Sequence, residues 1–454
     1  MAHLVVVGGG ITGLTAAFRA SQQEGFSVTL LEARPDLGGK VDTVALDGAR
    51  VELSADAFLP RDDVPLRLCR DIGIAAELVE PSDFGGWVFG SGGLTPLPAG
   101  TVLGFPTSPG IALRAKPLSI AGRLRAASEI FNRRPLSGPD VSVGSFTRAR
   151  LGREALDRLV DPLLAGTRAG DPDEMSLAAA VPPVDAAARA DRSVIRGLAR
   201  RAASAHEPPR FLAPRDGMHR IVEALEGAIS DVDVRREVRV GSIHHAGQSL
   251  TIDLDGDVLG ADAAIVTAPA HEAASLLRPL SEDAAAELSG IRAASSAVVN
   301  LIFPAGAVRL PPSGSGVLVP RSEATSISGC TWFSKKWPEA AASDGRLTIR
   351  CFVGRGIRDP ALDLSDRDLV GVVIEELRAM LGFEGGAIAS KVTRWDQGMP
   401  VYAVGHLERI ARIEAALARH PVRLAGASYR GSGIPDCIAQ AEAAVRGIVE
   451  ALRR

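Results

Sequence analysis

The stretch HLVVVGGGITG, which runs from His3 to Gly13, decides how the N-terminal part of this chain folds. Its apolar run predicts a buried parallel strand, and the glycine pattern that follows predicts a tight turn and the first turn of a helix. Because a helix N-terminus offers unpaired N–H groups to phosphate, this stretch forms a candidate dinucleotide-binding site. Its candidate contact residues are Gly8, Gly9, Gly10, Ile11, Thr12 and Gly13.

A second strand, Ser27–Leu31, ends on Glu32. A carboxylate at this position accepts hydrogen bonds from an adenosine ribose and disfavours a 2′-phosphate, so NADP is not the expected ligand. After it come Ala33 and the element Gly38-Gly39-Lys40, which NAD dehydrogenases do not usually carry. This continuation resembles the second signature of the flavin amine-oxidase and protoporphyrinogen-oxidase superfamily, in which a basic side chain helps to neutralise the cofactor. The resemblance implies FAD.

Composition excludes several classes of protein. The chain has 454 residues, long enough for two or three domains, and a net charge of −3, which gives no reason to expect a nucleic-acid partner. Its four cysteines show no metal-ligand spacing, so we expect no metal site and reduced, mostly buried thiols in a cytoplasmic protein. We expect neither a signal peptide nor a membrane-spanning segment.

The middle of the chain, from residue 111 to about 203, has a helical pattern. Ser119 can cap a helix, and the apolar residues that follow share one face: Ile120, Leu124, Ala127 and Phe131. Basic residues gather around this helix: Arg114, Lys116, Arg123, Arg125, Arg133 and Arg134. Two interpretations stay open, a helix that lies on a membrane surface and a core-packed helix with a solvated basic face. We favour the second.

Strands return after residue 210. The run from Asp262 to Pro269 predicts a buried strand that is stopped by the proline and rejoins the cofactor sheet. Residues 273 to 387 have the pattern of an antiparallel sheet bracketed by helices. Near the end of the chain, Val422–Ala425 predicts a strand that leads through a glycine-rich loop into a helix over Ile434–Arg453. The N–H groups at the start of that helix can meet a flavin ring and stabilise negative charge on it.

Motifs along nearly the whole chain resemble the bacterial protoporphyrinogen and coproporphyrinogen oxidases of haem synthesis. They are Gly8–Gly13, Gly38-Gly39-Lys40, Pro96-Leu97-Pro98, Asp161–Gly166 with Ala169-Gly170-Asp171, Trp395 with Met399-Pro400, and Ala425-Gly426 through Ile434–Ile438. The sequence departs from the family pattern at Ser54–Ala57, where Gly-Pro-Asp-Ser is expected. It departs again at Thr167-Arg168, where an aromatic residue often stands.

The resemblance implies an α/β fold similar to monoamine oxidase and protoporphyrinogen oxidase. A discontinuous Rossmann-like FAD-binding domain is expected over residues 1–60, 210–272 and 388–454. An antiparallel-sheet substrate domain is expected over residues 61–85, 192–209 and 273–387, and an inserted helical domain over residues 86–191. Beyond the glycine fingerprint, the FAD contacts that the resemblance implies are Glu32, Ala33, Gly39, Lys40, Ser54, Ala55, Asp56, Ala57, Val238, Trp395, Ile434, Pro435 and Asp436.

The activity that the resemblance implies is six-electron oxidation of coproporphyrinogen III to coproporphyrin III by O2, with H2O2 as the second product. Little acid or base catalysis is needed, so we name no catalytic residue. Candidate cations for the substrate propionates are Arg61, Lys116, Arg168 and Arg430. The partners are coproporphyrinogen III and O2, with contact to the inner face of the membrane and to a downstream haem-pathway enzyme left open. The oligomeric state is not predicted.

Other functions stay open for this sequence. Protoporphyrinogen IX oxidation and amine oxidation are the nearest alternatives, since both occur in the same superfamily. Ala427 follows Ala425-Gly426, where amine oxidases usually have an acidic residue, and aromatic residues are sparse. A carotenoid desaturase is a further alternative. A flavin-binding haem-assembly protein is the alternative without catalysis.

Overall fold

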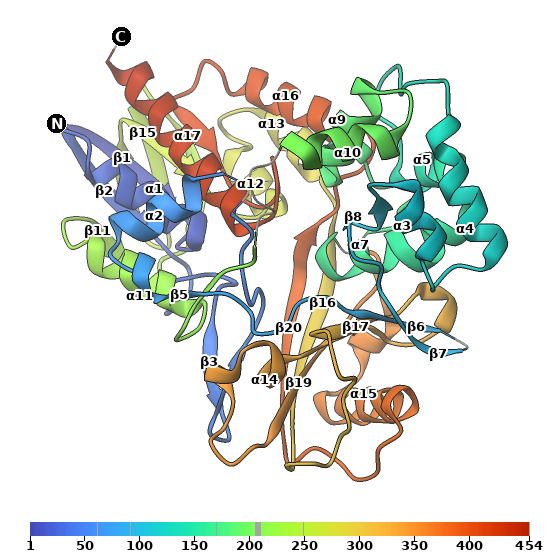
Figure 1. Ribbon diagram of the computed structural model, residues 1–454. Helices are drawn as coiled ribbons and strands as arrows, with labels where there is room; N and C mark the ends of the chain where they lie inside the picture. Colours follow the sequence, from blue (N-terminus) through green and yellow to red (C-terminus); the bar gives the residue numbers. More distant parts are fainter. Residues whose placement is uncertain (61, 91, 169, 205–209, 248, 454) are drawn as a thin grey trace.

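The computed structural model describes residues 1–60, 62–90, 92–168, 170–204, 210–247 and 249–453. A parallel sheet with helices on both faces lies beside a larger mixed sheet, and a group of helices packs against the larger sheet (Figure 1). This arrangement confirms the predicted α/β fold class with a Rossmann-like part.

Five strands from distant parts of the chain form the parallel sheet, in the order β11-β2-β1-β15-β21. Their bounds are Ala2–Val7 (β1), Phe26–Leu31 (β2), Asp233–Arg235 (β11), Ala263–Val266 (β15) and Val422–Leu424 (β21). The central strands are largely apolar because both faces are covered. One face packs against α1 (Ile11–Ser21), α11 (His219–Ala228) and α17 (Ile434–Leu452). The other packs against α12 (Ala270–Leu277), α13 (Glu282–Ser289) and α16 (His406–Ala416).

Several small antiparallel units complete the fold. A three-stranded sheet, β12-β13-β14, packs against the second face of the parallel sheet. Two-stranded units pair β3 with β4, which lies near the larger sheet, β5 with β10, and β8 with β9, which lies in the helical part. Their bounds are Thr43–Leu46 (β3), Ala49–Glu52 (β4), Leu78–Val79 (β5), Thr101–Val102 (β8), Phe105–Pro106 (β9), Ala213–Pro214 (β10), Val240–Ala246 (β12), Ser249–Leu254 (β13) and Asp257–Ala261 (β14).

The seven-stranded sheet has the order β20-β16-β19-β18-β17-β6-β7. Its strands are Trp87–Gly90 (β6), Gly93–Pro96 (β7), Ala293–Phe303 (β16), Gly316–Leu318 (β17), Ile327–Trp332 (β18), Leu347–Val353 (β19) and Ala389–Pro400 (β20). The helix α15 (Asp366–Leu381) covers one face with the apolar stripe that its sequence predicts. The other face carries polar side chains such as Asn300 and Arg350, which are paired across β16 and β19.

Short helical segments connect the strands of the two sheets. They are α2 (Val64–Asp71), η1 (Ala75–Glu77), η4 (Arg321–Glu323), α14 (Phe333–Lys336), η5 (Pro338–Ala340) and η6 (Pro360–Asp363). The inserted helical unit has its own core. It comprises α3 (Pro109–Arg114), α4 (Ile120–Ala127), η2 (Ser128–Phe131), α5 (Val143–Arg150), α6 (Arg153–Ala155), the π-helical turn η3 (Leu156–Val160), α7 (Asp161–Arg168), α8 (Leu177–Ala180), α9 (Pro182–Ala190) and α10 (Val194–Ser204).

The favoured interpretation of α4 as a core-packed helix is wrong. Ser119 does cap α4, since its hydroxyl accepts a hydrogen bond from the Gly122 N–H. However, Ile120, Leu124 and Phe131 are exposed by 75, 59 and 80%, and only the small Ala127 of the predicted stripe is buried. Helical periodicity identifies the apolar face but does not fix the direction in which that face points.

The predicted division into three domains stays a prediction, and several segments pack differently from it. The strands β6 and β7, predicted to lie in the helical domain, join the seven-stranded sheet, and so does β20, which was grouped with the FAD-binding domain. Helix α2, grouped with the substrate domain, packs against the parallel-sheet core, and α10 packs against the helical core. Hydrogen-bonding partners from distant residues decide these placements, and such partners are not encoded locally.

All four cysteines are buried and none forms a disulfide, as predicted. In the described part of the chain, no helix combines the length and hydropathy that crossing a bilayer requires. Among the same residues, no group of three or more metal-ligating side chains is arranged to hold a metal ion.

A buried carboxylate joins the last helix to the first. Glu442 on α17 accepts hydrogen bonds from Arg19 on α1 at 2.9 Å and from Arg67 on α2 at 2.6 Å. Its side chain is 7% exposed. Removal of one partner from a buried ion pair costs more than the pair itself contributes, because the remaining charges lose their compensation.

We therefore expect Glu442→Ala to lower the free energy of unfolding by about 3 kcal/mol, which urea unfolding of the holoprotein will measure. The matched control is Glu375→Ala, which removes a carboxylate that is 71% exposed and paired with Arg378. The control should cost less than about 1 kcal/mol. Equal losses in the two variants would contradict the structural role of Glu442.

Candidate functional site

The first turn of α1 lies directly against the end of β1. Gly8 adopts φ of +104°, and a Cβ atom added at Gly13 would lie 1.8 Å from the Gly8 carbonyl oxygen. The Thr267 hydroxyl, which follows β15, donates to the carbonyls of Val7 and Gly8 and fixes this crossing. No side chain caps α1 and its first turn holds no acidic residue, so its N–H groups remain free to meet an anion.

The loop after β2 runs alongside this turn. Gly38 N–H donates to the Gly9 carbonyl, and a Cβ atom at Gly39 would lie 3.1 Å from the Cα of Gly10. The Glu32 carboxylate accepts hydrogen bonds from the N–H groups of Gly9 and Arg34 at 2.6 and 2.9 Å. Val238 N–H donates to the Glu32 carbonyl, so the structure brings Val238 to the fingerprint as well.

The space around Gly10 shows whether this turn has room for a dinucleotide. A Cβ atom at Gly10 would have no protein atom nearer than Gly39 Cα at 3.9 Å, whereas a Cβ at Gly13 would collide with backbone. The protein itself therefore does not need glycine at position 10 for packing. The open space above an uncapped helix N-terminus fits a pyrophosphate, which needs close approach to the backbone.

The N-terminus of α17 reaches the same place from the other end of the chain. Gly433 is its N-cap and Asp436 accepts the Gly433 N–H at 3.2 Å. Cys437, one turn into the helix, is hydrogen-bonded to the side chain of Thr12 on α1, and burial raises the pKa of its thiol to about 11. The predicted residues Ile434, Pro435 and Asp436 therefore lie next to Thr12.

Lys40 connects these helix ends to the seven-stranded sheet. Its ammonium group donates to the Gly398 carbonyl in β20, and burial lowers the pKa of Lys40. Three residues earlier on β20, Trp395 Nε1 donates to the Leu53 carbonyl at 2.9 Å. An unbroken line of contacts thus joins both helix N-termini, Lys40, β20 and the loop after β4.

That loop, Ser54–Ala57, is fixed to the polar face of the sheet by charge. Asp56 accepts hydrogen bonds from Lys336 at 2.8 Å and from Trp337 Nε1 at 3.4 Å, and Arg350 Nη1 lies 3.6 Å away. Burial alone would raise the pKa of Asp56, but these cations hold it down at about 2. Arg350 is 1% exposed and burial lowers its pKa.

Sequence reasoning missed the side chains that hold these loops. Thr267 had a local signal, because it lies near the end of the run predicted as a buried strand, at the carboxyl edge of a parallel sheet, where ligands bind. Lys336, Arg350 and Asn300, which donates to the Glu52 carbonyl at 3.2 Å, had none. The roles of Arg350 and Asn300 depend on the register of antiparallel strands, and Lys336 lies on the short helix α14.

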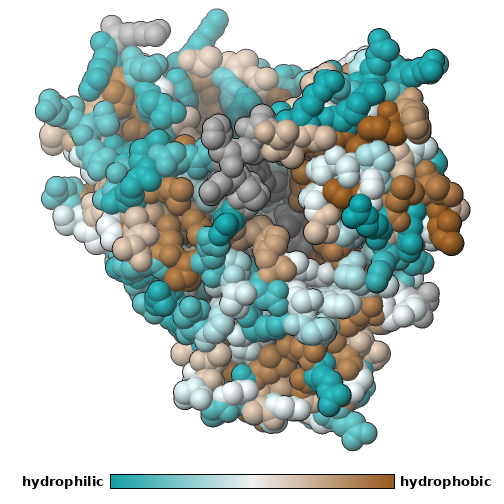
Figure 2. Space-filling model, viewed as in Figure 1, coloured by the Kyte–Doolittle hydropathy of each residue, from teal (hydrophilic) through white to brown (hydrophobic). Residues whose placement is uncertain are grey.

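The structure describes the side chains of two of the four residues predicted to bind the substrate propionates, Lys116 and Arg430. Lys116 is exposed between α3 and α4 of the helical unit, and Arg430 is held by Glu414 on α16 at 2.6 and 2.9 Å. Arg61 lies outside the described residues, and so does the side chain of Arg168 at the end of α7. Figure 2 shows a hollow in the middle of one face, between the parallel-sheet part and the helical unit.

The sequence model of the family described as Flavin containing amine oxidoreductase matches residues 11–449. The chain belongs to this family. Its membership confirms the superfamily that the motifs predicted and a flavin as the cofactor.

Several relatives of this chain are named coproporphyrinogen III oxidase. The chain is 36% identical to the coproporphyrinogen III oxidase of Bacillus subtilis over 98% of this chain and 97% of that one. It is 30% identical to the protein of that name from Staphylococcus aureus over 99% of both chains. It is 33% identical to the one from Propionibacterium freudenreichii over 99% of this chain and 91% of that one. These names confirm the predicted resemblance to porphyrinogen oxidases.

Solved structures agree with the fold. A crystal structure from Exiguobacterium, provisionally assigned as a protoporphyrinogen oxidase, superposes with a TM-score of 0.88 and 31% identity over 100% of this chain and 99% of that one. Putrescine oxidase bound to putrescine gives a TM-score of 0.70 at 17% identity over 100% of this chain and 99% of that one, which shows a shared fold only.

We expect Gly10→Ala to fold normally but to lose flavin, because the added methyl group fills space that only a ligand needs. Absorbance of the purified protein should show at least a tenfold lower flavin affinity with an unchanged melting temperature of the flavin-free form. Gly371→Ala, at an open position within α15, is the matched control and should keep its flavin. Full flavin content in Gly10→Ala would contradict the assignment of the phosphate site.

The buried carboxyl group of Glu52 is expected to make the stability of the folded protein depend on pH. Its carboxylate is 3% exposed and accepts from Met218 N–H and the Thr43 hydroxyl, each at 2.9 Å. Burial raises its pKa from 4.5 to about 7. A raised carboxyl pKa means that the folded state binds the proton more tightly. This stabilisation is complete below pH 4.5 and is lost as the pH rises through 7.

Between pH 4.5 and 8 we expect wild-type protein to lose about 3 kcal/mol more unfolding free energy than Glu52→Gln, which has no proton to release. Urea unfolding of both proteins across this range will measure the difference, because other titrating groups contribute equally to each. Parallel pH profiles would show that Glu52 does not carry a raised pKa.

Proposed function

We propose that this protein is an FAD-dependent oxidase that converts coproporphyrinogen III to coproporphyrin III. Three molecules of O2 would accept six hydrogens and leave as three molecules of H2O2. The proposal is supported chiefly by one observation, the line of contacts that joins Thr12, Cys437, Lys40 and Gly398 in a chain that is 36% identical to a coproporphyrinogen III oxidase.

We assign the dinucleotide half of FAD to the fingerprint. Gly8–Gly13 would bind the pyrophosphate, with the uncapped N–H groups in the first turn of α1 as donors. Glu32 would accept hydrogen bonds from the adenosine ribose in exchange for those it now accepts from the backbone. Ala33, Gly39 and Val238 would line the adenosine end, since Val238 N–H donates to the Glu32 carbonyl. FMN, which has no adenosine, would leave this half without a role.

We assign the flavin ring to the residues that surround Lys40. Ser54–Ala57, Trp395 and Ile434–Asp436 would hold its edges. When bound, FAD supplies a two-electron acceptor for a hydride from a meso carbon of the substrate. The chain contributes positive potential through the α17 N-terminus and Lys40, which stabilises negative charge arriving at the ring. It also orients the substrate, and orientation is the main requirement of such a transfer.

Four propionates on coproporphyrinogen III require cations around the substrate. Arg61 and Arg168 remain our candidates for this role. Arg430 already has Glu414 as its partner, and Lys116 lies with other basic residues on the helical unit, so we give these two lower priority. We further propose a cytoplasmic location, which four buried and reduced cysteines support.

Parallel turnover of coproporphyrinogen III, protoporphyrinogen IX and putrescine by the purified holoprotein tests this function. Porphyrin fluorescence should rise faster with coproporphyrinogen III than with protoporphyrinogen IX, and an oxygen electrode should record three O2 consumed for each porphyrin formed. Gly10→Ala is the control that separates enzymatic from spontaneous oxidation. Faster oxidation of protoporphyrinogen IX or putrescine would overturn the substrate assignment, and bound flavin without turnover of any of the three would indicate a protein without catalysis.

A further inference from the structure

The loop of residues 425–433 joins β21 to α17 and ends at the helix N-terminus that we assign to the flavin ring. We call it the α17 loop. Gly431 in this loop has φ of +120°, and a Cβ atom added to it would lie 2.6 Å from Cγ of Asp436, in the first turn of α17. Gly431 therefore packs directly against the start of the helix.

Two aromatic side chains hold the α17 loop at alternate residues. The Tyr402 hydroxyl donates to the Ala427 carbonyl at 2.5 Å and accepts from the Gly431 N–H at 3.0 Å. Burial lowers the pKa of His406, so its ring is neutral, and the carbonyl oxygen of Tyr429 at 2.7 Å places the proton on Nε2. The rings of Tyr402 and His406 stack with centroids 4.2 Å apart and planes inclined by 22°. Both residues are 3% exposed, so water does not compete for these contacts.

The main chain of Tyr402, which lies between β20 and α16, is attached to the helical unit. Ser176, the N-cap of α8, donates its N–H to the Tyr402 carbonyl at 2.8 Å. The next residue continues this pairing, since Ala403 forms an antiparallel bridge with Met175, which is buried in the helical core. Tyr402 therefore contacts the helical unit with its backbone and the α17 loop with its side chain.

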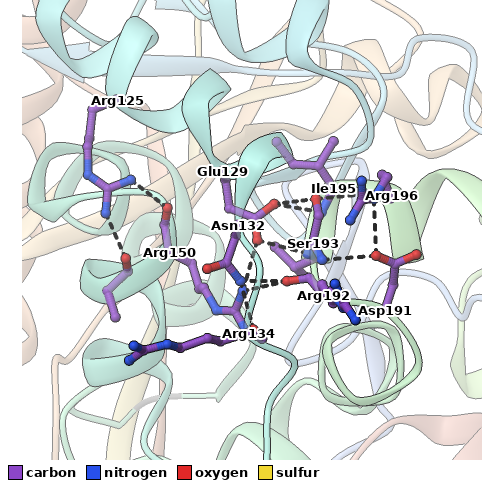
Figure 3. A network of polar contacts seen from close by, with 12 residues as sticks. Arg125, Glu129, Asn132, Arg134, Arg150, Asp191, Arg192, Ser193, Ile195 and Arg196 are labelled. Atoms are coloured by element: carbon purple, nitrogen blue, oxygen red, sulfur yellow. Dashed lines mark hydrogen bonds and ion pairs between the residues drawn. The ribbon is translucent and has the colours of Figure 1, made fainter.

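Buried polar contacts make the helical unit a fixed support for Tyr402. Glu129 accepts hydrogen bonds from the Ser193 hydroxyl at 2.6 Å and from the N–H groups of Val194 and Ile195 at 2.9 and 3.2 Å, so it neutralises the N-terminus of α10 (Figure 3). Arg150 on α5 pairs with the same carboxylate at 3.2 Å. These contacts join α5, η2 and α10 into one body.

We propose that Tyr402 is a positioning residue for the oxidation, because its hydroxyl holds the N-terminus of α17 against the flavin ring. The inference rests on the proposed function, which places the ring at this helix end. Loss of the hydroxyl would remove a partner from both the Gly431 N–H and the Ala427 carbonyl and would release the α17 loop from the helical unit at these residues. The positive end of the helix would then stabilise negative charge on the reduced ring less well.

Tyr402→Phe tests this role, because it removes the hydroxyl and keeps the ring that stacks on His406. In the holoprotein we expect the equilibrium between oxidised and reduced flavin to shift about tenfold toward the oxidised form, which lowers the two-electron midpoint potential by about 30 mV. Reduction beside a dye of known potential will measure this shift. With coproporphyrinogen III, kcat should fall at least tenfold while KM stays within twofold of wild type, because the helix end acts on the ring and not on the substrate.

Tyr429→Phe is the matched control, because Tyr429 is the only other tyrosine of the chain and is 2% exposed. Its hydroxyl donates to the Ala268 carbonyl at 3.2 Å, outside the α17 loop. This variant should lower the melting temperature about as much as Tyr402→Phe but keep the wild-type potential. An unchanged potential in Tyr402→Phe, or an equal shift in both variants, would overturn the inference.

Amide hydrogen exchange of the flavin-free protein decides the question if Tyr402→Phe does not retain flavin. The inference predicts faster exchange in Tyr402→Phe at residues 427–436 and unchanged exchange in the core of the parallel sheet. Faster exchange throughout the molecule would show a general loss of stability and would contradict it. Neither the potential nor the exchange rates require turnover of a porphyrinogen, so failure of this inference is distinct from failure of the proposed function.

Discussion

The contact between the first turn of α1 and the end of β1 is the constraint on which the rest of the site depends. It requires that position 13 has no side chain, since a Cβ atom would lie 1.8 Å from the Gly8 carbonyl oxygen. This close crossing directs the α1 N-terminus toward the loop at Gly38-Gly39, and that loop in turn carries Lys40. Without the crossing, neither the glycine loop nor α17 would have a fixed surface to pack against.

Two parts of the chain more than 300 residues apart then complete one site. Cys437 on α17 meets Thr12, and Lys40 meets Gly398 of the seven-stranded sheet. The same sheet fixes the loop that holds Asp56 through Lys336 and Arg350. Buried charges are costly unless paired, so this cluster holds the two halves of the molecule in a defined arrangement and surrounds the proposed FAD site with fixed charge.

The first forty residues could be interpreted from sequence because the signals are local: an apolar strand, a glycine turn and a carboxylate at the end of the next strand. The residues proposed to hold the flavin ring could be named only through the family resemblance. The contacts of Arg350 and Asn300 depend on a strand register that no short sequence pattern specifies. The orientation of α4 was predicted wrongly for a similar reason. Glu129 finds its partners at Ser193 and Ile195, more than 60 residues away, and those partners decide which side faces inward.

A crystal structure of the holoprotein tests the central claim, that both ends of the chain build one FAD site. The account predicts a pyrophosphate above Gly10, a ribose at Glu32 and a flavin ring bounded by Lys40, Trp395 and the first turn of α17. A flavin ring that lies away from Lys40 and α17, or a mononucleotide that leaves Glu32 bonded to Gly9, would contradict it.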